Sequence, residues 1–225
     1  MDSDPQGFRR FEKIIIDPLK FAQGLVDHLM AACPDDVDTQ LAVFDLALRK
    51  QTLGPALTAL EEAVRLSTNR HPGVIQRLFP FAYFVRAGSG RWKRVNKGGT
   101  FAIMYICMYC ELMNVLFKAQ FSFILDAEQK ARLDGLVGAP NVETACLAFL
   151  ADSDEQIRVA TANALLVIDL KKYQGPVETA LGKTTRPLDV ALAAREVLSQ
   201  VEGGAKAHLD LCLASWPLAS KLFKR

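Results

Sequence analysis

The stretch that decides the fold reads Asp36-Val-Asp-Thr-Gln-Leu-Ala-Val-Phe-Asp-Leu-Ala-Leu-Arg-Lys50 and continues, after a short link, into residues 53–68. In its first half, the apolar residues Leu41, Phe44 and Leu48 recur at helical spacing, so one face of a helix is apolar. Ala56, Leu60 and Ala63 repeat this pattern in the second half. Because the link is only a few residues long, the sequence predicts two antiparallel helices packed closely together.

The second of these helices has the composition of a helical repeat. Small residues at Ala56 and Ala63, with Leu60 between them, are typical of the second helix of a tetratricopeptide unit. Phe44 is bulkier than this repeat prefers in its first helix, so we interpret the pair as one degenerate repeat unit. Such units bury their faces by stacking on neighbours, which predicts helical flanks. The predicted repeat core consists of Leu41, Phe44, Leu48, Ala56, Leu60 and Ala63.

Helical patterns and helix-capping residues continue along most of the chain. Asp17-Pro18 predicts a helix start, and Pro80 should end or kink the helix that begins after His71. Further helices are expected over residues 126–137, 141–150, 153–168, 173–181, 187–201 and 206–223, with Ser153 as the cap of the third. Apart from a short lead-in around Ile14, no segment alternates apolar and polar residues over any length. The predicted fold is therefore all-α, a fragment of a TPR-like α-solenoid built from stacked antiparallel helix pairs.

Three regions are expected within the 225 residues: helical hairpins over 1–87, a basic glycine-rich loop with an apolar insert over 88–124, and a carboxy-terminal helical bundle over 125–225. Half of the residues are apolar, and the net charge is only +2. The mean hydropathy of +0.12 favours a soluble protein. Five cysteines without a secretory signal indicate reduced, mostly buried thiols in a cytoplasmic protein.

No set of residues predicts catalysis, a cofactor or a metal ion. The histidines His28, His71 and His208 are far apart, and a capping or surface position is expected for each. Cys107 and Cys110 have the spacing of a zinc ligand pair, but neither a second pair nor a histidine is near enough to complete a site. An enzyme is therefore not predicted.

The basic segment 86–97 could contact RNA, since clustered cations and an aromatic ring suit phosphates and bases. A solvated surface loop is the favoured interpretation. The candidate RNA or ribosome contacts are Arg86, Arg91, Trp92, Lys93, Arg94 and Lys97.

Residues 101–117 form an apolar run that is short for a membrane span and contains Glu111 and Asn114, so a buried core helix is expected. The composition of residues 91–121 differs sharply from both flanks. A further hypothesis is that they are a lineage-specific insert, or intervening sequence read as coding, which peptides from the native protein would decide.

Taken together, these segments resemble the carboxy-terminal helical region of the auxiliary, ribosome-anchoring subunit of the NatA amino-terminal acetyltransferase. The residues that carry the resemblance, in the family's order, are Asp17-Pro18-Leu19, Phe21-Ala22, Asp38-Thr39, Leu41, Phe44, Leu48-Arg49-Lys50, Ala63, His71-Pro72, Arg77-Leu78-Phe79, 128–138, Glu143-Thr144, Phe149-Leu150, Ser153, Ala160 and 166–170. Residues 88–123 are largely extra relative to the family, and its long array of upstream repeats is absent. The chain is therefore expected to be a fragment, a truncated paralogue or an incomplete gene product.

The resemblance implies a non-catalytic scaffold that supports co-translational acetylation of nascent amino termini through protein–protein contacts. It implies as partners the catalytic N-acetyltransferase subunit, a small ubiquitin-associated-domain regulator similar to huntingtin-interacting protein K, and the ribosome, with no membrane. The alternative function is an RNA- or ribosome-binding helical module that acts through residues 86–97.

Overall fold

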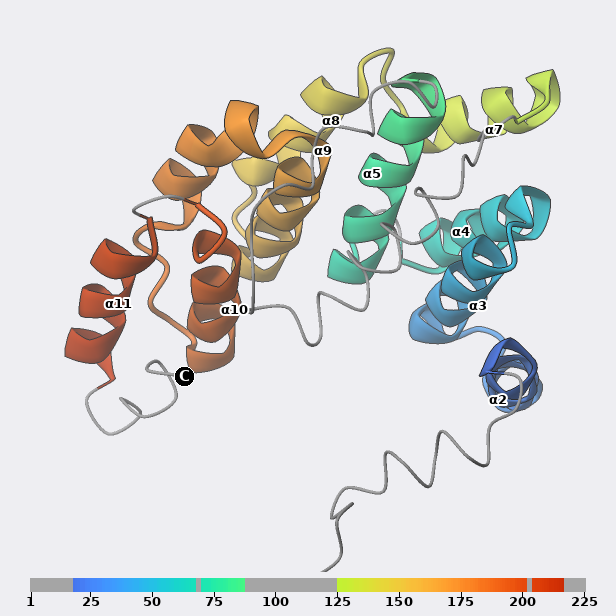
Figure 1. Cartoon of the computed structure of the whole chain (residues 1–225), viewed down its shortest axis with the longest axis horizontal. Helices are drawn as coiled ribbons and strands as arrows, with labels where there is room; N and C mark the ends of the chain where they lie inside the picture. The colour runs from blue at the N-terminus through green and yellow to red at the C-terminus, as the bar shows by residue number, and fades with distance from the viewer. Residues whose placement is uncertain (1–17, 68–69, 88–124, 202–203, 217–225) are drawn as a thin grey trace, which may run out of the picture. The chain divides into compact units, whose positions relative to one another are not determined.

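The computed structural model describes residues 18–67, 70–87, 125–201 and 204–216 (Figure 1), and every regular element in these ranges is an α-helix. The predicted all-α fold is thus confirmed for this part of the chain. The chain divides into two compact units, Met1–Leu66 and Ser67–Arg225. Among the described helices, none combines the length and the apolar composition that a membrane crossing requires.

The first unit contains α2 (Pro18–Ala32), α3 (Val37–Arg49) and nearly all of α4 (Leu53–Ser67). Asp36 caps α3, because its carboxylate accepts a hydrogen bond from the Thr39 amide at 2.8 Å. Helices α2 and α3 pack against each other. The Lys50 ammonium adds a 2.6 Å hydrogen bond to the Gln23 side chain of α2.

The link between α3 and α4 is a tight turn centred on Gln51. The Gln51 amide donates to the Leu48 carbonyl at 3.0 Å, and the Thr52 amide donates to the Ala47 carbonyl at 2.9 Å. This pair of bonds is the Schellman motif that ends many helices. It requires a left-handed backbone at Gln51, whose φ is 61°.

The apolar faces of α3 and α4 are buried. All six residues of the expected repeat core have side chains with 4% or less of their surface exposed. The amphipathic pattern of the sequence therefore identifies the face of each helix that is removed from water.

The second unit contains α5 (Pro72–Ala87), α7 (Ala127–Val137), α8 (Val142–Leu150), α9 (Glu155–Leu181), α10 (Leu188–Leu198) and α11 (Gly204–Ser215). Helix α9 is central, because it packs on α5, α8 and α10 (Figure 1). Helix α5 also packs on α7 and α8, and α11 packs on α10. These three neighbours of α5 lie in the second unit, whereas the sequence grouped residues 72–87 with the amino-terminal hairpins.

Helix α5 does not end near Phe79, as the sequence suggested it could, but continues through Pro80 to Ala87. Proline removes one backbone hydrogen bond from a helix and clashes with the preceding turn. Burial offsets this cost, since Phe79, Phe81 and Ala82 beside the proline are almost completely buried.

Helix α9 begins at a different cap from the one predicted. Asp154, not Ser153, accepts hydrogen bonds from the amides of Gln156 and Ile157, at 2.8 and 3.4 Å. A carboxylate is also favoured over a hydroxyl by the positive end of the helix dipole. The predicted break between two helical segments appears as a non-helical backbone at Asp169, with φ −158° and ψ 98°.

Helices α7 and α8 agree with the predicted ranges 126–137 and 141–150. Asp126 and Gln129 form a reciprocal capping box at the start of α7, and Gly138 ends that helix in the left-handed conformation. Asn141 caps α8. The basic segment from residue 88 onward and the apolar run 101–117 lie outside the described residues.

Candidate functional site

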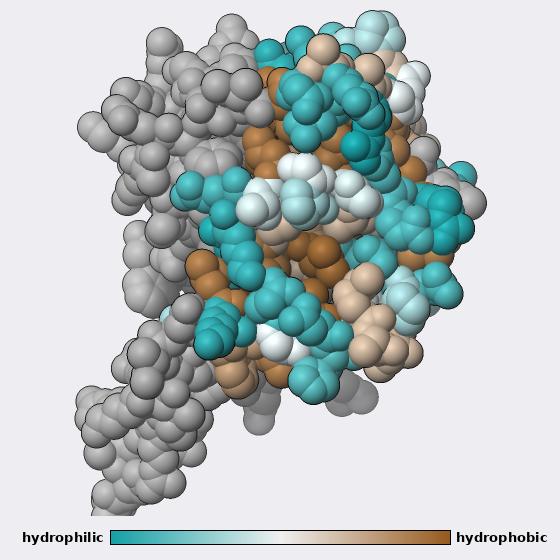
Figure 2. Space-filling model, turned by 90° about the vertical axis from the view of Figure 1, so that its right-hand side faces the viewer, coloured by the Kyte–Doolittle hydropathy of each residue, from teal (hydrophilic) through white to brown (hydrophobic). Residues whose placement is uncertain are grey.

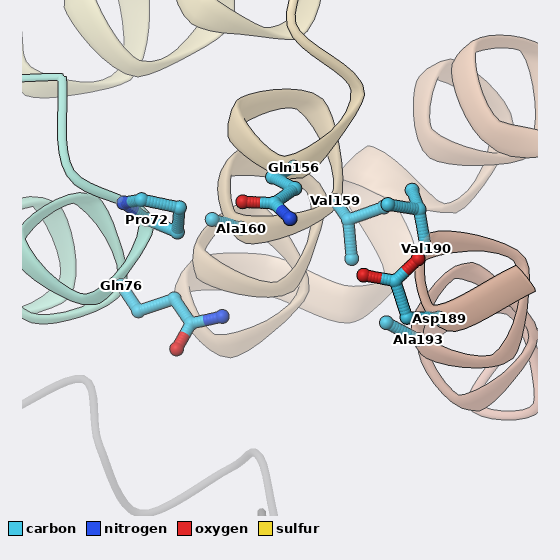
Figure 3. A pocket seen from close by; sticks show the side chains of 8 residues that line it. All are labelled: Pro72, Gln76, Gln156, Val159, Ala160, Asp189, Val190 and Ala193. Carbon is cyan, nitrogen blue, oxygen red and sulfur yellow. The ribbon is translucent and has the colours of Figure 1, made fainter. Parts of the chain in front are cut away.

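A shallow groove lies on the second unit (Figure 3). It has a volume of about 200 Å³. Helices α5, α9 and α10 supply its walls, and its lining residues are Pro72, Gln76, Gln156, Val159, Ala160, Asp189, Val190 and Ala193.

The groove combines an apolar floor with polar groups at its edge. Ala160 and Val190 are buried beneath it. The side-chain amides of Gln76 and Gln156 and the Asp189 carboxylate border the same opening (Figure 3). Within the described ranges, none of these three polar side chains has a hydrogen-bond or ion-pair partner in the protein. Their bonding capacity is therefore available to a bound group.

The position of each polar group follows from local sequence. Gln156 and Asp189 lie in the first turns of α9 and α10, and Pro72 begins α5. Pro80 has no N–H to donate to the backbone carbonyl of Gln76, four residues earlier. On the α5 wall of the groove, the backbone carbonyl of Gln76 therefore lacks the hydrogen bond that it would accept in a regular helix, and it lies next to the Gln76 side-chain amide.

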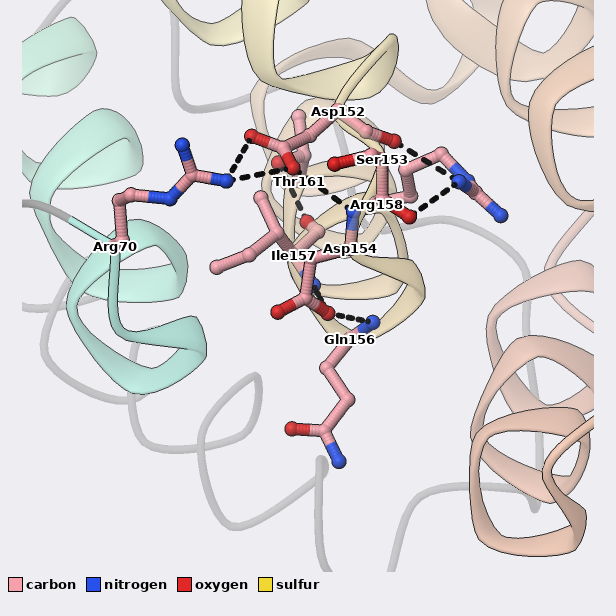
Figure 4. A network of polar contacts seen from close by, with 8 residues as sticks. All are labelled: Arg70, Asp152, Ser153, Asp154, Gln156, Ile157, Arg158 and Thr161. Carbon is pink, nitrogen blue, oxygen red and sulfur yellow. Dashed lines mark hydrogen bonds and ion pairs between the residues drawn. The ribbon is translucent and has the colours of Figure 1, made fainter.

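A network of polar contacts fixes the start of α9, which forms the centre of the groove (Figure 4). Arg70 donates to both carboxylate oxygens of Asp152, at 2.9 and 3.0 Å. The same carboxylate accepts from the amide of Asp154, the α9 cap, at 2.9 Å. Asp152 thereby links the segment before α5 to the first turn of α9.

Arg158 completes this network from within α9. Its guanidinium donates to the Asp152 carbonyl at 2.9 Å and to the Glu155 carboxylate at 3.1 Å. The buried Thr161 hydroxyl donates to the Ile157 carbonyl at 2.7 Å (Figure 4). Contacts on both sides therefore hold the first turns of α9, and these turns position Gln156 at the groove.

The size and lining of the groove suit a segment of another polypeptide. Its volume is smaller than the roughly 300–1,000 Å³ of typical small-molecule pockets, but it can take one side chain with its backbone. A glutamine amide both donates and accepts, so it can pair with either a peptide N–H or a peptide C=O. Within the described residues, no cluster of three histidine, cysteine or acidic side chains could hold a metal ion.

A second surface feature is the apolar side of α2. Leu25 and Leu29, one turn apart, are 54% and 45% exposed. Figure 2 shows one face of the molecule, on which exposed hydrophobic residues (brown) lie between hydrophilic ones (teal). Exposed apolar residues at helical spacing are common on surfaces that contact other proteins.

Of the predicted RNA contacts, Arg86 belongs to a contact between α5 and α7. Its guanidinium donates to the Asp134 carboxylate at 2.8 Å and to the Pro140 carbonyl at 2.9 Å. The other candidates, Arg91, Trp92, Lys93, Arg94 and Lys97, lie outside the described residues.

The histidines differ from one another in the structure. His28 is exposed and its ring contacts the Gly24 carbonyl at 2.6 Å, as a surface position predicts. His208 is completely buried, so the expectation of a surface or capping histidine is wrong there. Its neighbours, Thr184 and Cys212, were not singled out by the sequence. Only the apolar surroundings of residues 209–213 could have indicated this burial.

A scan against models of known families, a search of curated proteins and a search of solved structures each find no match for this chain. The likeness to the NatA auxiliary subunit therefore rests on the ordered residues quoted above.

Proposed function

We propose that this chain is a non-catalytic helical scaffold, similar to the carboxy-terminal part of the NatA auxiliary subunit, that supports co-translational amino-terminal acetylation through protein–protein contacts. Its partners would be the catalytic acetyltransferase subunit and the small ubiquitin-associated-domain regulator. The groove between α5, α9 and α10 would be one point of contact.

The observation that carries this proposal is the set of unpaired polar groups around the groove. Gln76, Gln156 and Asp189 border an apolar floor, and within the described ranges their side chains have no hydrogen-bond or ion-pair partner. Amides beside buried apolar residues can bind a partner's backbone and one of its apolar side chains together. The start of α9, which presents Gln156, is held by the Arg70–Asp152 network.

The alternative, an RNA-binding module, has less support among the described residues. The Arg86 guanidinium is used by Asp134 and by the carbonyls of residues 139 and 140. The alternative now depends on residues 91–97, which the structure does not describe.

The test is to express the tagged full chain in its own cells and to identify co-purifying proteins by mass spectrometry at moderate salt. Recovery of an acetyltransferase catalytic subunit or its small regulator would support the scaffold. Recovery of ribosomal proteins alone, lost after nuclease treatment, would favour the RNA-binding module and contradict the proposal.

A substitution in the groove tests whether the groove contacts the partner protein. Ala193 lines the groove on α10, and Ala193→Arg would fill it with a long cationic side chain. Ala131→Arg is the matched control, since Ala131 is exposed on α7, away from the groove lining. We expect at least about tenfold less partner, about 1.4 kcal/mol, with Ala193→Arg and no change with Ala131→Arg. Equal recovery from both variants would exclude the groove as the contact point.

A further inference from the structure

The most unusual polar cluster outside the groove lies where α11 meets the loop between α9 and α10. The His208 side chain on α11 has no exposed surface. Its Nε2 lies 2.8 Å from the backbone carbonyl of Thr184. The sulfur of Cys212, one helical turn further along, lies 3.6 Å from Nδ1 and 3.7 Å from Nε2 of the same ring. Both nitrogens of a buried ring thus have partners.

These partners determine which form of the ring the site accepts. A carbonyl can only accept a hydrogen bond, so Nε2 carries the hydrogen and donates a hydrogen bond to the Thr184 carbonyl. Nδ1 of the neutral ring is then an acceptor, and the Cys212 thiol can donate to it. Burial raises the pKa of the Cys212 thiol, which keeps its hydrogen on the sulfur. The neutral imidazole therefore satisfies both contacts.

Protonation of the ring would disturb this arrangement. Nδ1 would become a second donor that faces a sulfur atom, which is a weak acceptor. The positive charge would be buried, with Arg195 of α10 as a nearby like charge. Burial, followed by the smaller effect of Arg195, lowers the pKa of His208, although its bond to the Thr184 carbonyl acts in the opposite direction. Among the described residues, no carboxylate contributes to the shift of the His208 pKa.

Helix α11 depends strongly on this loop. The indole N–H of Trp216 donates to the Thr185 carbonyl at 2.6 Å, and Arg186 lies over the Trp216 ring at 5.9 Å. His208, within α11, and Trp216, directly after its last residue, thus hold the helix to two consecutive carbonyls. Between these anchors, the helix packs against α10 through Cys212, Ala191 and the apolar residues around them.

We propose that the His208–Thr184–Cys212 cluster is an acid-sensitive latch, which holds α11 on α10 while the imidazole is neutral and releases the helix when the ring is protonated. The latch is independent of the proposed scaffold function. Release would expose the apolar side of α10 at Leu188, Ala191 and Leu192, which α11 covers in the closed state. The chain would thus present a new apolar surface at acidic pH.

The direction of the pH effect follows from linkage. Because His208 has a lowered pKa in the folded state, the unfolded or released state binds more protons as the pH falls below the ordinary histidine value of about 6.5. The closed state is therefore fully favoured above that pH. The equilibrium for opening should rise by about tenfold per pH unit below it, until the folded-state pKa is reached.

Hydrogen exchange of the full-length protein, followed by mass spectrometry at pH 7.5 and 5.0, tests the latch when labelling times are corrected for intrinsic exchange. We expect α11 peptides to lose protection at pH 5.0 by up to about 30-fold, relative to peptides from 155–168 of α9. In His208→Gln, whose amide can still donate to the Thr184 carbonyl, the difference between the two pH values should disappear. His28→Gln, at an exposed site, should behave like wild type.

A second variant and a second signal keep the test decisive if His208→Gln fails to fold. Arg195→Met retains the buried histidine but removes the like charge, so the loss of α11 protection should become smaller. In a Trp92→Phe background, the remaining Trp216 reports directly on release by its fluorescence. Equal loss of protection in α9 and α11, or unchanged Trp216 emission between pH 7.5 and 5.0, would overturn the latch.

Discussion

At the scale of single residues, Gln51 occupies a position where the turn requires a left-handed backbone, a conformation that is unfavourable for a residue with a side chain. The Schellman bonds from Gln51 and Thr52 form only when residue 51 is left-handed, and its φ of 61° meets that condition. A non-glycine residue carries a conformational cost in this region. Within the described part of the chain, no hydrogen bond or ion pair of the exposed Gln51 side chain explains its presence.

Gln51→Gly should therefore stabilise the first unit. Glycine removes the strain of the left-handed conformation, and its greater freedom in the unfolded chain offsets part of the gain, which leaves about 0.5–1 kcal/mol. Thermal unfolding of the full chain would measure this as a higher midpoint. Lys50→Gly is the control, because Lys50 has a right-handed backbone, with φ −79°. This change should lower the midpoint, and a lower midpoint for Gln51→Gly as well would contradict the assigned turn.

At the scale of elements, the helix starts are set by short polar side chains, and α9 distinguishes two adjacent candidates. Asp154 accepts from two amides of the first turn, while Ser153 contributes its backbone carbonyl to Arg158. Replacement of the Ser153 side chain leaves that carbonyl in place. The cap thus depends on the carboxylate alone.

Asp154→Ala should destabilise the second unit by about 1 kcal/mol, the usual cost of a lost helix cap. Ser153→Ala should change stability by less than about 0.5 kcal/mol, as expected for a surface change without a special contact. Urea unfolding curves followed by circular dichroism would compare the two variants. A larger loss for Ser153→Ala would mean that the serine, and not the aspartate, begins α9.

At the scale of the whole molecule, the division after Leu66 gives each unit its own core. Phe44 and Leu60 are buried in the first unit, and Ile157 and Leu165 are buried in the second. A change in one core should therefore act mainly on the helices of that unit. This expectation concerns the stability of each unit and does not depend on how the two units are arranged.

Phe44→Ala should cost about 3–5 kcal/mol, because a buried aromatic ring is replaced by a cavity. Hydrogen exchange should show the loss of protection in α2, α3 and α4, with much smaller changes in peptides from α9. The reverse pattern is expected for Leu165→Ala. A uniform loss over both units in either variant would show that the chain unfolds as one cooperative body.

The sequence by itself determined the helical class and the bounds of helices such as α7 and α8. Asp36, Asp126, Asn141 and Gly138 act within one helical turn of their position, so their roles can be read from neighbouring residues. The same holds for the apolar faces of α3 and α4, because a period of 3.6 residues identifies the side that is removed from water.

Only the tertiary structure decided the features that depend on distant partners. Helix α5 continues through Pro80 because apolar burial by other helices offsets the lost hydrogen bond. The groove joins residues from α5, α9 and α10, which lie far apart in the chain. His208 can be buried because the Thr184 carbonyl, 24 residues away, accepts a hydrogen bond from its ring. Local patterns carry no information about such contacts, since packing between helices alone brings these groups together.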